Sequence, residues 1–190
     1  MKKIISLFQR NYDGDKLVRD EVVPGAEWVL SGEGIATRKR DGTACMVRGK
    51  LYKRYDAKKG KTPPPGFEPS QEPDEVTGHW PGWIPVSETD PGDKWHREAW
   101  EKHRPEHDGT YELCGPKVQG NPEGLQEHRF FHHGMEFLNT VPLNFTDLKA
   151  WFAQQDMEGI VWHHTDREGK MVKIKRKDFG LPWPIKREGR

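Results

Sequence analysis

Cysteine is scarce in this sequence of 190 residues, which holds only two copies. Cys45 and Cys114 show no Cys-x-x-Cys spacing, and both lie in apolar segments typical of strands. This usage argues against a disulfide framework and against a zinc site made from paired cysteines. We therefore expect two reduced thiols in the core of a cytoplasmic protein.

Long apolar runs and a strong net charge are also missing. No run approaches the roughly 20 residues of a transmembrane helix, and Met1-Lys2-Lys3 is followed by too few apolar residues for a signal peptide. No membrane partner is expected. The formal net charge of +1 excludes a globally basic surface of the histone kind, although a local basic groove remains compatible with it.

The sequence is rich in large aromatic residues, with 8 tryptophans and 8 phenylalanines. They offset a hydrophobic fraction of only 33%, because each aromatic side chain buries a large area. A chain of this length can bury one core, so we expect a monomeric single domain over residues 1–190. The apolar patterns predict an α+β fold with antiparallel hairpins. The predicted strands cover 34–40, 43–47, 51–55, 110–114, 159–163 and 170–175, and the predicted helices cover 94–103 and 146–155.

Two local signals accompany these elements. Asp41-Gly42 between two predicted strands indicates a hairpin turn. Asp93 directly precedes a predicted helix, where its side chain is expected to cap the first turn.

One segment differs in composition from the rest of the chain. Residues 56–80 are poor in aliphatic side chains and contain Pro63-Pro64-Pro65-Gly66. Because ordinary connections are much shorter, the segment is predicted to be a flexible loop or lid. Residues 176–190 are predicted to form a C-terminal tail.

Lysines and carboxylates follow one another in an order that suggests covalent chemistry. Lys39 lies in Lys39-Arg40-Asp41-Gly42, a lysine beside a carboxylate and a glycine at a turn. A free lysine has a pKa of about 10.4, so it needs nearby cations or a metal before its amine can attack. Lys173 and Lys175 alternate with Ile174, so both point to one strand face, where they can hold a phosphate and crowd Lys39 with positive charge. Taken alone, they also fit a solvated strand face.

Acidic and basic residues on other predicted strands complete the pattern. One of Glu112 and Glu158 is expected to accept hydrogen bonds from ribose hydroxyls and the other to hold Mg²⁺ or Mn²⁺. Arg54 can bind a ribose oxygen or a terminal phosphate, or be one of several basic surface residues. Asp41 orients its turn or binds a metal-held water. The set suits transfer of a nucleotide through a lysine phosphoramidate.

Histidines and aromatics leave alternatives open. The histidines are clustered enough for a zinc site, and His103 and His107 have helical spacing, but Pro105 interrupts the helix and no cysteine is near. An aromatic side chain should stack on a nucleotide base, with Phe130 and Phe131 as competing candidates. Trp80 and Trp83 are candidates for stacking on nucleic-acid bases.

The chain resembles the covalent nucleotidyltransferases, which include ATP-dependent ligases and mRNA capping enzymes. Four further motifs are similar to those of the ATP-dependent 5′-3′ RNA ligases of vertebrate cells and their microbial and viral relatives, and the likeness runs from about residue 33 to residue 185. The motifs are Gly78-His79-Trp80-Pro81-Gly82-Trp83-Ile84-Pro85-Val86, Gly120-Asn121-Pro122-Glu123-Gly124-Leu125, Glu158-Gly159-Ile160-Val161-Trp162-His163 and Phe179-Gly180-Leu181-Pro182-Trp183-Pro184-Ile185.

The resemblance implies an antiparallel-sheet, ATP-grasp-like adenylation domain without an OB-fold, because only residues 176–190 follow Lys175. Lys39 would carry AMP, and Glu112 and Glu158 would match the essential acidic positions. Arg54 would lie beside the ribose. Lys173 would match a late lysine, and the position of Lys175 varies within the family.

The function that these residues favour is ATP-dependent joining of an RNA 5′-phosphate to a 3′-hydroxyl, with Mg²⁺ or Mn²⁺. A capping-type guanylyltransferase or a DNA ligase core is the alternative among enzymes. A non-catalytic RNA-binding or zinc-binding module is the alternative from another class.

Overall fold

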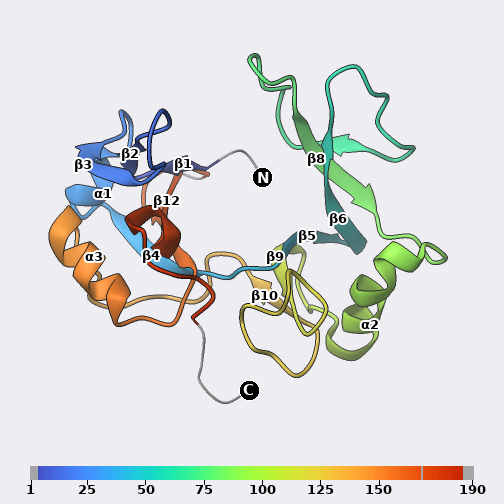
Figure 1. Cartoon of the computed structure of the whole chain (residues 1–190). Coiled ribbons are helices and arrows are strands. Elements are labelled where there is room, and N and C mark those ends of the chain that lie inside the picture. The colour runs from blue at the N-terminus through green and yellow to red at the C-terminus, as the bar shows by residue number, and fades with distance from the viewer. Residues whose placement is uncertain (1–3, 168, 186–190) are drawn as a thin grey trace. The chain divides into compact units, whose positions relative to one another are not determined.

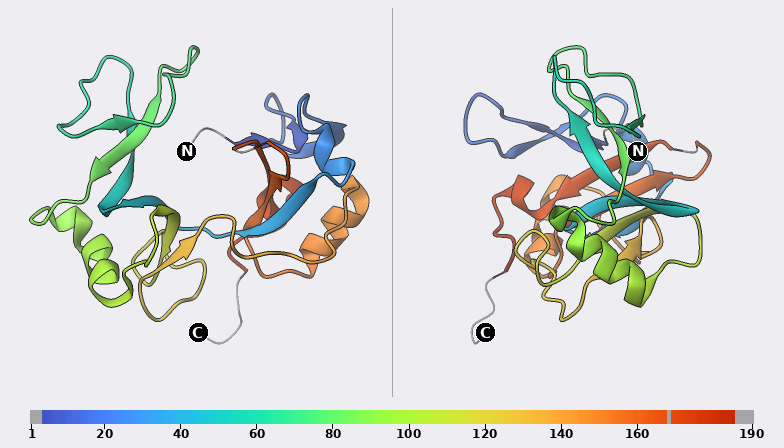
Figure 2. Two further views of the ribbon diagram at one scale, coloured as in Figure 1. Left: turned by 180° about the vertical axis from the view of Figure 1, so that it is seen from behind. Right: turned by 90° about the vertical axis from the view of Figure 1, so that its right-hand side faces the viewer.

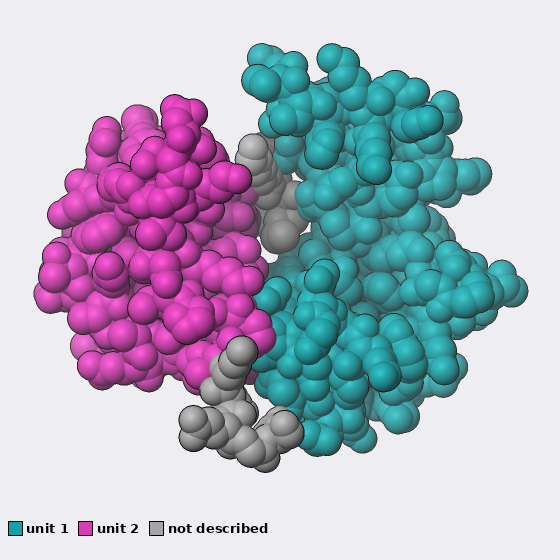
Figure 3. Space-filling view, viewed as in Figure 1, with its two compact units in different colours: residues 1–3, 41–133 teal, residues 4–40, 134–190 magenta. Residues whose placement is uncertain are grey.

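The protein is described by a computed structural model that covers residues 4–167 and 169–185. The chain divides into two compact units (Figure 3). Unit 1 comprises residues 41–133, and unit 2 comprises residues 4–40 together with the chain from residue 134 onward. The chain thus leaves unit 2 after Arg40 and re-enters it at Gly134, and each unit has its own sheet and its own hydrophobic core.

Unit 2 is built on a four-stranded sheet with the order β1-β12-β11-β4 (Figure 1). β11 is antiparallel to both β12 and β4, whereas the short β1 is parallel to β12. A two-stranded ribbon of β2 and β3 completes the strands of this unit. Its elements are β1 (Ile5–Ser6), β2 (Phe8–Arg10), β3 (Val18–Val22), α1 (Glu27–Leu30), β4 (Gly34–Lys39), α3 (Phe145–Ala153), β11 (Gly159–His164), β12 (Met171–Lys175) and the 3-10 helix η2 (Arg176–Phe179).

The core of unit 2 lies between α3 and one face of this sheet. Leu148 and Phe152 of α3 are fully buried, as are Ile160 of β11 and Ile174 of β12, and all four belong to one cluster. The helix predicted over 146–155 is therefore confirmed with slightly different ends, and its apolar stripe covers the sheet. The other sheet face is left for polar side chains.

Unit 1 is built on a six-stranded sheet with the order β10-β9-β5-β6-β8-β7. Figure 2 shows the ribbon of this unit from two further sides. All of its pairings are antiparallel. The two units together thus form an α+β structure with mostly antiparallel sheets and few helices. The elements of unit 1 are β5 (Thr43–Arg48), β6 (Lys50–Ala57), β7 (Glu68–Pro69), β8 (Trp80–Pro85), the 3-10 helix η1 (Pro91–Asp93), α2 (Lys94–His103), β9 (Gly109–Cys114) and β10 (Arg129–His132).

The core of unit 1 lies where α2 covers this sheet. Ala99 of α2 packs with Cys45 of β5 and Leu113 of β9, and all three side chains are fully buried. Cys114 is also buried, and neither cysteine forms a disulfide. The expectation of two reduced core thiols is therefore confirmed.

The prediction of a hairpin at Asp41-Gly42 is wrong. β4 pairs with β11, while β5 pairs with β6 and β9, so the two strands on either side of this dipeptide lie in different sheets. The amide of Asp41 donates to Glu123 Oε1 and the amide of Gly42 donates to Glu112 Oε1, both at 3.0 Å. The amides of Asp41 and Gly42 are thus hydrogen-bonded to side chains, whereas in a hairpin they would be hydrogen-bonded within the turn or to the paired strand.

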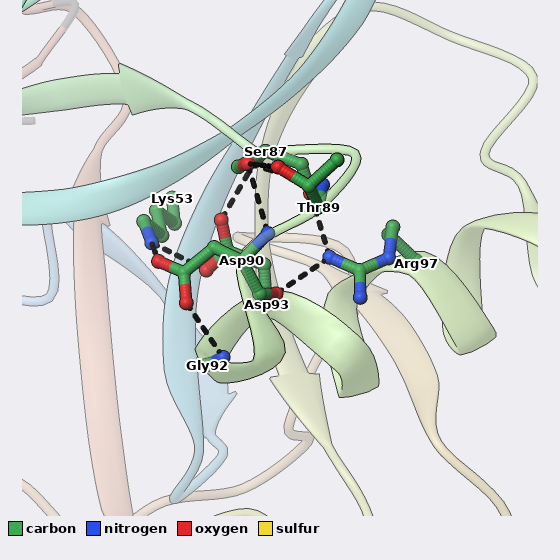
Figure 4. A network of polar contacts seen from close by, with 7 residues as sticks. All are labelled: Lys53, Ser87, Thr89, Asp90, Gly92, Asp93 and Arg97. Atoms are coloured by element: carbon green, nitrogen blue, oxygen red, sulfur yellow. Dashed lines mark hydrogen bonds and ion pairs between the residues drawn. The ribbon is translucent and has the colours of Figure 1, made fainter.

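The predicted helix 94–103 is confirmed, but the capping role of Asp93 is wrong. Asp93 is fully buried and its side chain makes no cap hydrogen bond. Its carboxylate instead contacts Lys53 Nζ and accepts from the amide of Ser87 at 2.8 Å (Figure 4). Asp90 caps the preceding 3-10 turn by accepting from the amide of Gly92 at 2.8 Å. Burying a carboxylate is costly unless it is paired, and the contact with Lys53 supplies that partner.

The segment 56–80 contains regular structure at both ends. β6 continues to Ala57, β8 begins at Trp80, and β7 in between pairs with β8. In the described part of the chain, no helix combines the length and the apolar character needed to cross a bilayer.

Candidate functional site

The lysine predicted to be the nucleophile lies at the end of β4 in unit 2. Lys39 is opposite Gly159 of β11, and Gly159 is in turn opposite Lys175 of β12. Side chains of directly paired residues share a sheet face, so Lys39 and Lys175 project from the same end of the face that α3 leaves uncovered. A Cβ at Gly159 would come 2.4 Å from the Ile174 carbonyl oxygen, so this position between the two lysines requires glycine.

Glu158 connects the two lysines. Its Oε2 lies 2.5 Å from Lys39 Nζ, and its Oε1 lies 2.7 Å from Lys175 Nζ. The glutamate side chain is only 6% exposed, so both ion pairs form largely away from water. Residues 160–162, which follow at the start of β11, are buried, as the sequence predicted for a carboxylate at the mouth of a buried strand.

Lys173 lies two residues before Lys175 on the same face of β12, opposite Val161. Burial lowers the pKa of Lys173, and the positive charges of Lys175 and Lys39 lower it further. The prediction that these lysines share one strand face is confirmed, and the three ammonium groups are close enough to affect one another electrostatically.

The strand that carries the two late lysines is fixed at its end by residues that the sequence analysis did not select. Asp178 accepts from the amide of Lys175 at 2.8 Å through Oδ2 and pairs with Arg10 through Oδ1. Arg176 is buried and donates to the carbonyl oxygens of Gln155 at 2.7 Å and Pro182 at 2.8 Å, and also to that of Phe152. The late Lys-x-Lys-Arg-x-Asp run therefore combines outward lysines with two anchoring residues.

The other predicted residues belong to unit 1. Glu112 of β9 is paired with Phe131 of β10 and with Ala44 of β5. Continuing the register across β5 and β6 places Arg54 on the same sheet face as Glu112 and Phe131. Phe130 instead packs against the unit 1 core. The strand register thus separates two phenylalanines that the sequence alone left undecided.

Arg54 and Trp83 lie together on this face. Arg54 Nε is 3.0 Å from Asp56 Oδ1, and its guanidinium carbon is 5.8 Å from the centre of the Trp83 ring. Trp83 is only 4% exposed, so its predicted use as a stacking platform for nucleic-acid bases is wrong. Trp80 is partly buried and donates from Nε1 to the Gln71 carbonyl at 2.8 Å.

Asp41 and Gly42 follow Lys39 closely in the sequence and belong to unit 1. A Cβ at Gly42 would come 2.2 Å from the Leu113 carbonyl oxygen, which explains the glycine in Lys-x-Asp-Gly. Glu123, from the motif Gly120-Asn121-Pro122-Glu123-Gly124, binds the Asp41 amide. The sequence offered no sign of this role, because the contact joins residues far apart along the chain.

His128 makes contacts unrelated to a metal site. His128 lies 3.0 Å from Glu98 through Nδ1, accepts from the Lys117 amide at 3.2 Å and stacks on Trp95. Across residues 4–167 and 169–185, no three His, Cys, Asp or Glu side chains converge as a group that could hold a metal ion. The carboxylates of Glu158 and Glu112 are hard oxygen donors, the kind that suits Mg²⁺ when substrate phosphates supply further ligands.

Comparisons with known proteins converge on one family. A sequence model described as RNA ligase 1 matches residues 101–188. The chain is 34% identical to "RNA ligase 1" of Pongo abelii over 146 residues, which cover 60% of this chain and 44% of that protein. It is 28% identical to "RNA ligase 1" of Rattus norvegicus over 226 aligned residues, with 80% and 69% covered, and 33% identical to the Danio rerio protein of that name over 146 residues. The chain thus spans 44% to 69% of the length of these relatives.

Proposed function

We propose that the chain, which is similar to RNA ligase 1 proteins, belongs to that family and is an ATP-dependent RNA ligase with Lys39 as its nucleophile. The observation that carries the proposal is the contact of one buried carboxylate, Glu158, with the ammonium groups of both Lys39 and Lys175. Neighbouring cations or a bound metal are the means by which a lysine amine becomes nucleophilic, and Lys173 and Lys175 supply such cations on the same sheet face.

The first step of the proposed reaction is transfer of AMP to the enzyme. The neutral amine of Lys39 attacks the α-phosphorus of ATP, a nitrogen–phosphorus bond forms, the bond to pyrophosphate breaks, and the amine loses a proton. Lys173 and Lys175 project from the same sheet face and can bind the α-phosphate oxygens. Glu158 pairs with the Lys39 ammonium before the reaction.

The second and third steps use the RNA ends. An oxygen of the RNA 5′-phosphate attacks the AMP phosphorus, releases Lys39 and leaves an AMP-capped end. The 3′-hydroxyl of the other end then attacks the 5′-phosphate phosphorus, AMP leaves, and a phosphodiester forms. The printed name of the relatives, RNA ligase 1, favours this substrate over the DNA or cap substrates of the alternative enzymes.

Unit 1 would bind the nucleoside part of ATP. Arg54, Glu112 and Phe131 share one sheet face, with a cation and a carboxylate for ribose oxygens and an aromatic ring for adenine. Glu158 is the candidate ligand of unit 2 for Mg²⁺ or Mn²⁺, and Glu112 and Asp41 are the separate candidates of unit 1. A bound ion would supply charge stabilisation for the departing pyrophosphate. Glu158 fits such an ion, since its buried carboxylate already binds positive charge.

Several broader expectations stay predictions. They are a monomer that acts as one nucleotidyltransferase domain over residues 1–190, a lid formed by residues 56–80 and an ATP-grasp-like arrangement. The tail predicted over 176–190 begins as the 3-10 helix η2, and its residues 186–190 lie outside the described part of the chain.

The first test of the proposal is adduct formation on Lys39. After incubation with ATP and Mg²⁺, intact-mass measurement should show one added AMP, which Lys39→Ala removes entirely. Lys149→Ala, an exposed lysine on α3 of the same unit, is the matched control and should still form the adduct. A parallel incubation with α-labelled GTP separates the guanylyltransferase alternative. An AMP adduct on Lys39→Ala would refute the assignment, and no adduct on the parent protein would favour a non-catalytic binding module.

A further inference from the structure

His133 directly contacts the carboxylate proposed to bind ribose. His133 Nε2 lies 2.9 Å from Glu112 Oε2, and His133 Nδ1 lies 3.0 Å from Thr110 Oγ1. The backbone amide of His133 also donates to the Thr110 carbonyl oxygen at 3.0 Å. The imidazole is therefore fixed by two side-chain contacts, to Thr110 and Glu112 of β9, and the backbone contact fixes the position of the residue that carries it.

For a neutral imidazole, the polarity of these hydrogen bonds fits one arrangement of protons. A neutral imidazole has one donor and one acceptor nitrogen, and a carboxylate is an acceptor only. Nε2–H therefore donates to Glu112, and Nδ1 accepts from the hydroxyl of Thr110. Both ring nitrogens of His133 then have a suitable partner, which favours a single orientation of the ring.

The second oxygen of Glu112 accepts a hydrogen bond from a residue that lies close to Lys39 in the sequence. Glu112 Oε1 accepts from the amide of Gly42 at 3.0 Å, and Gly42 ends the Lys-x-Asp-Gly motif that begins at Lys39. The Glu112 side chain is 13% exposed, and a carboxylate offers about four lone-pair directions. Two of these are occupied in the protein, so capacity remains for a ligand hydroxyl.

We propose that His133 is a positioning residue that fixes the Glu112 carboxylate so that it reads a ribose hydroxyl of ATP. This inference rests on the proposed function, in which unit 1 binds the nucleoside. Without the imidazole, Glu112 would keep only its hydrogen bond to Gly42 and could rotate about its side-chain bonds. The ribose would then meet a mobile carboxylate, and binding would lose both affinity and discrimination between ribose and deoxyribose.

The neighbouring His132, the last residue of β10, provides a matched control. Its ring lies against Tyr111, with the ring centres 4.6 Å apart, on the opposite face of the sheet from Glu112. Replacing His132 perturbs the same strand without touching the carboxylate. An effect specific to His133 can therefore be separated from a general disturbance of β10 and the residues after it.

The experiment is single-turnover adenylylation of the full chain with ATP, 2′-deoxyATP and 3′-deoxyATP. The parent should prefer ATP over at least one deoxynucleotide. In His133→Ala, the ATP concentration that gives half the limiting rate should rise about tenfold, which corresponds to one lost hydrogen bond to a charged group. The limiting rate should change much less, and the preference for ribose should fall toward one. His133→Gln, whose amide can donate to Glu112, should recover most of both properties, and His132→Ala should keep the parent preference.

The outcomes separate this inference from the proposed function. A parent protein that forms no AMP adduct would overturn the proposed function itself. A parent that forms the adduct but does not distinguish ribose from deoxyribose would overturn the role of Glu112, and with it that of His133. Unchanged discrimination in a folded His133→Ala protein, or equal losses in His132→Ala, would also overturn the inference. Thermal unfolding of each variant establishes that it is folded.

Discussion

Glu158 is the residue on which the lysine cluster of unit 2 depends, because its two oxygens pair with two different ammonium groups. Removing the negative charge leaves Lys39, Lys173 and Lys175 together on one sheet face with no carboxylate between the outer two. The charge that organises Lys39 before attack, and that would hold a divalent cation, is then lost.

The variant Glu158→Gln tests this role, since it keeps the shape of the side chain and removes the charge. We expect the rate of AMP-adduct formation to fall by about a hundredfold or more, the scale of losing a group that acts on charge in the reaction. The rate is measured by intact mass over time, with Mg²⁺ and separately with Mn²⁺, which should restore it only in part. Glu33→Gln is the control, because Glu33 faces His164 at the far end of β11. A near-parental rate for Glu158→Gln would show that Glu158 is dispensable.

Much of this cluster could be predicted from single residues. Strand alternation places Lys173 and Lys175 on one face, and the apolar run after Glu158 places this carboxylate at the start of a buried strand. The contacts of Glu112 with His133 and of Glu123 with the Asp41 amide could not be predicted, because each depends on sheet register or on a loop that returns from far along the chain.

At the scale of elements, β12 and the 3-10 helix η2 that follows it are anchored together. The lysines of β12 point outward, while Arg176 points inward and donates to the carbonyl oxygens of Phe152 and Gln155 at the end of α3. The Phe152 carbonyl also accepts from the amide of Gln155 at 3.1 Å, so the guanidinium adds a second donor at the C-terminus of the helix. The same guanidinium also holds Pro182, so one side chain joins three segments of unit 2.

Replacing this arginine is expected to destabilise unit 2. Arg176→Met keeps most of the volume but removes the guanidinium hydrogen bonds to three carbonyl oxygens, which should lower the free energy of unfolding by about 3 kcal/mol. Urea unfolding followed by tryptophan fluorescence measures the change. Lys177→Met, at the exposed neighbouring position, should differ from the parent by less than about 0.5 kcal/mol. Equal stability of the parent and Arg176→Met would contradict the anchoring role.

Element boundaries were predicted better than element pairing. The helix over Lys94–His103 and the hairpin of β11 and β12 follow from local patterns of apolar residues and turns. The supposed hairpin at Asp41-Gly42 failed because turn residues act locally, whereas the partner of a strand is chosen by burial along its whole length. Ala36 and Thr37 of β4 are buried beside β11, and the turn residues Asp41-Gly42 contain no information about this pairing.

For the whole molecule, the proposed substrate is a pair of RNA ends, and the described surface offers phosphate contacts on the segment between β6 and β8. Lys58, Lys59 and Lys61 are exposed there, although nearby acidic residues partly balance their charge. Trp83 is buried and cannot contribute stacking. Binding should therefore depend more on phosphate than on base contacts.

Ligation of matched 5′-phosphorylated strands, all RNA against all DNA, tests this expectation across a salt series. RNA should be joined better, because the 2′-hydroxyl is what distinguishes the two polymers. The logarithm of the binding constant should fall with the logarithm of salt concentration by about 0.7 for each phosphate contact. Pre-adenylylated strands serve as the control that separates RNA binding from the first step. Equal or better joining of DNA would overturn the RNA assignment while leaving the AMP adduct unaffected.

The two buried cysteines have a practical consequence for such measurements. Cys45 and Cys114 are 0% and 1% exposed, and burial raises the pKa of the Cys45 thiol well above its usual value. Since the thiolate is the form that reacts with alkylating dyes, the native thiols should label slowly. A single cysteine introduced at an exposed position such as Lys149 would then accept a fluorophore selectively, without first removing the native pair. The chain is therefore a convenient background for optical reporters of nucleotide and RNA binding.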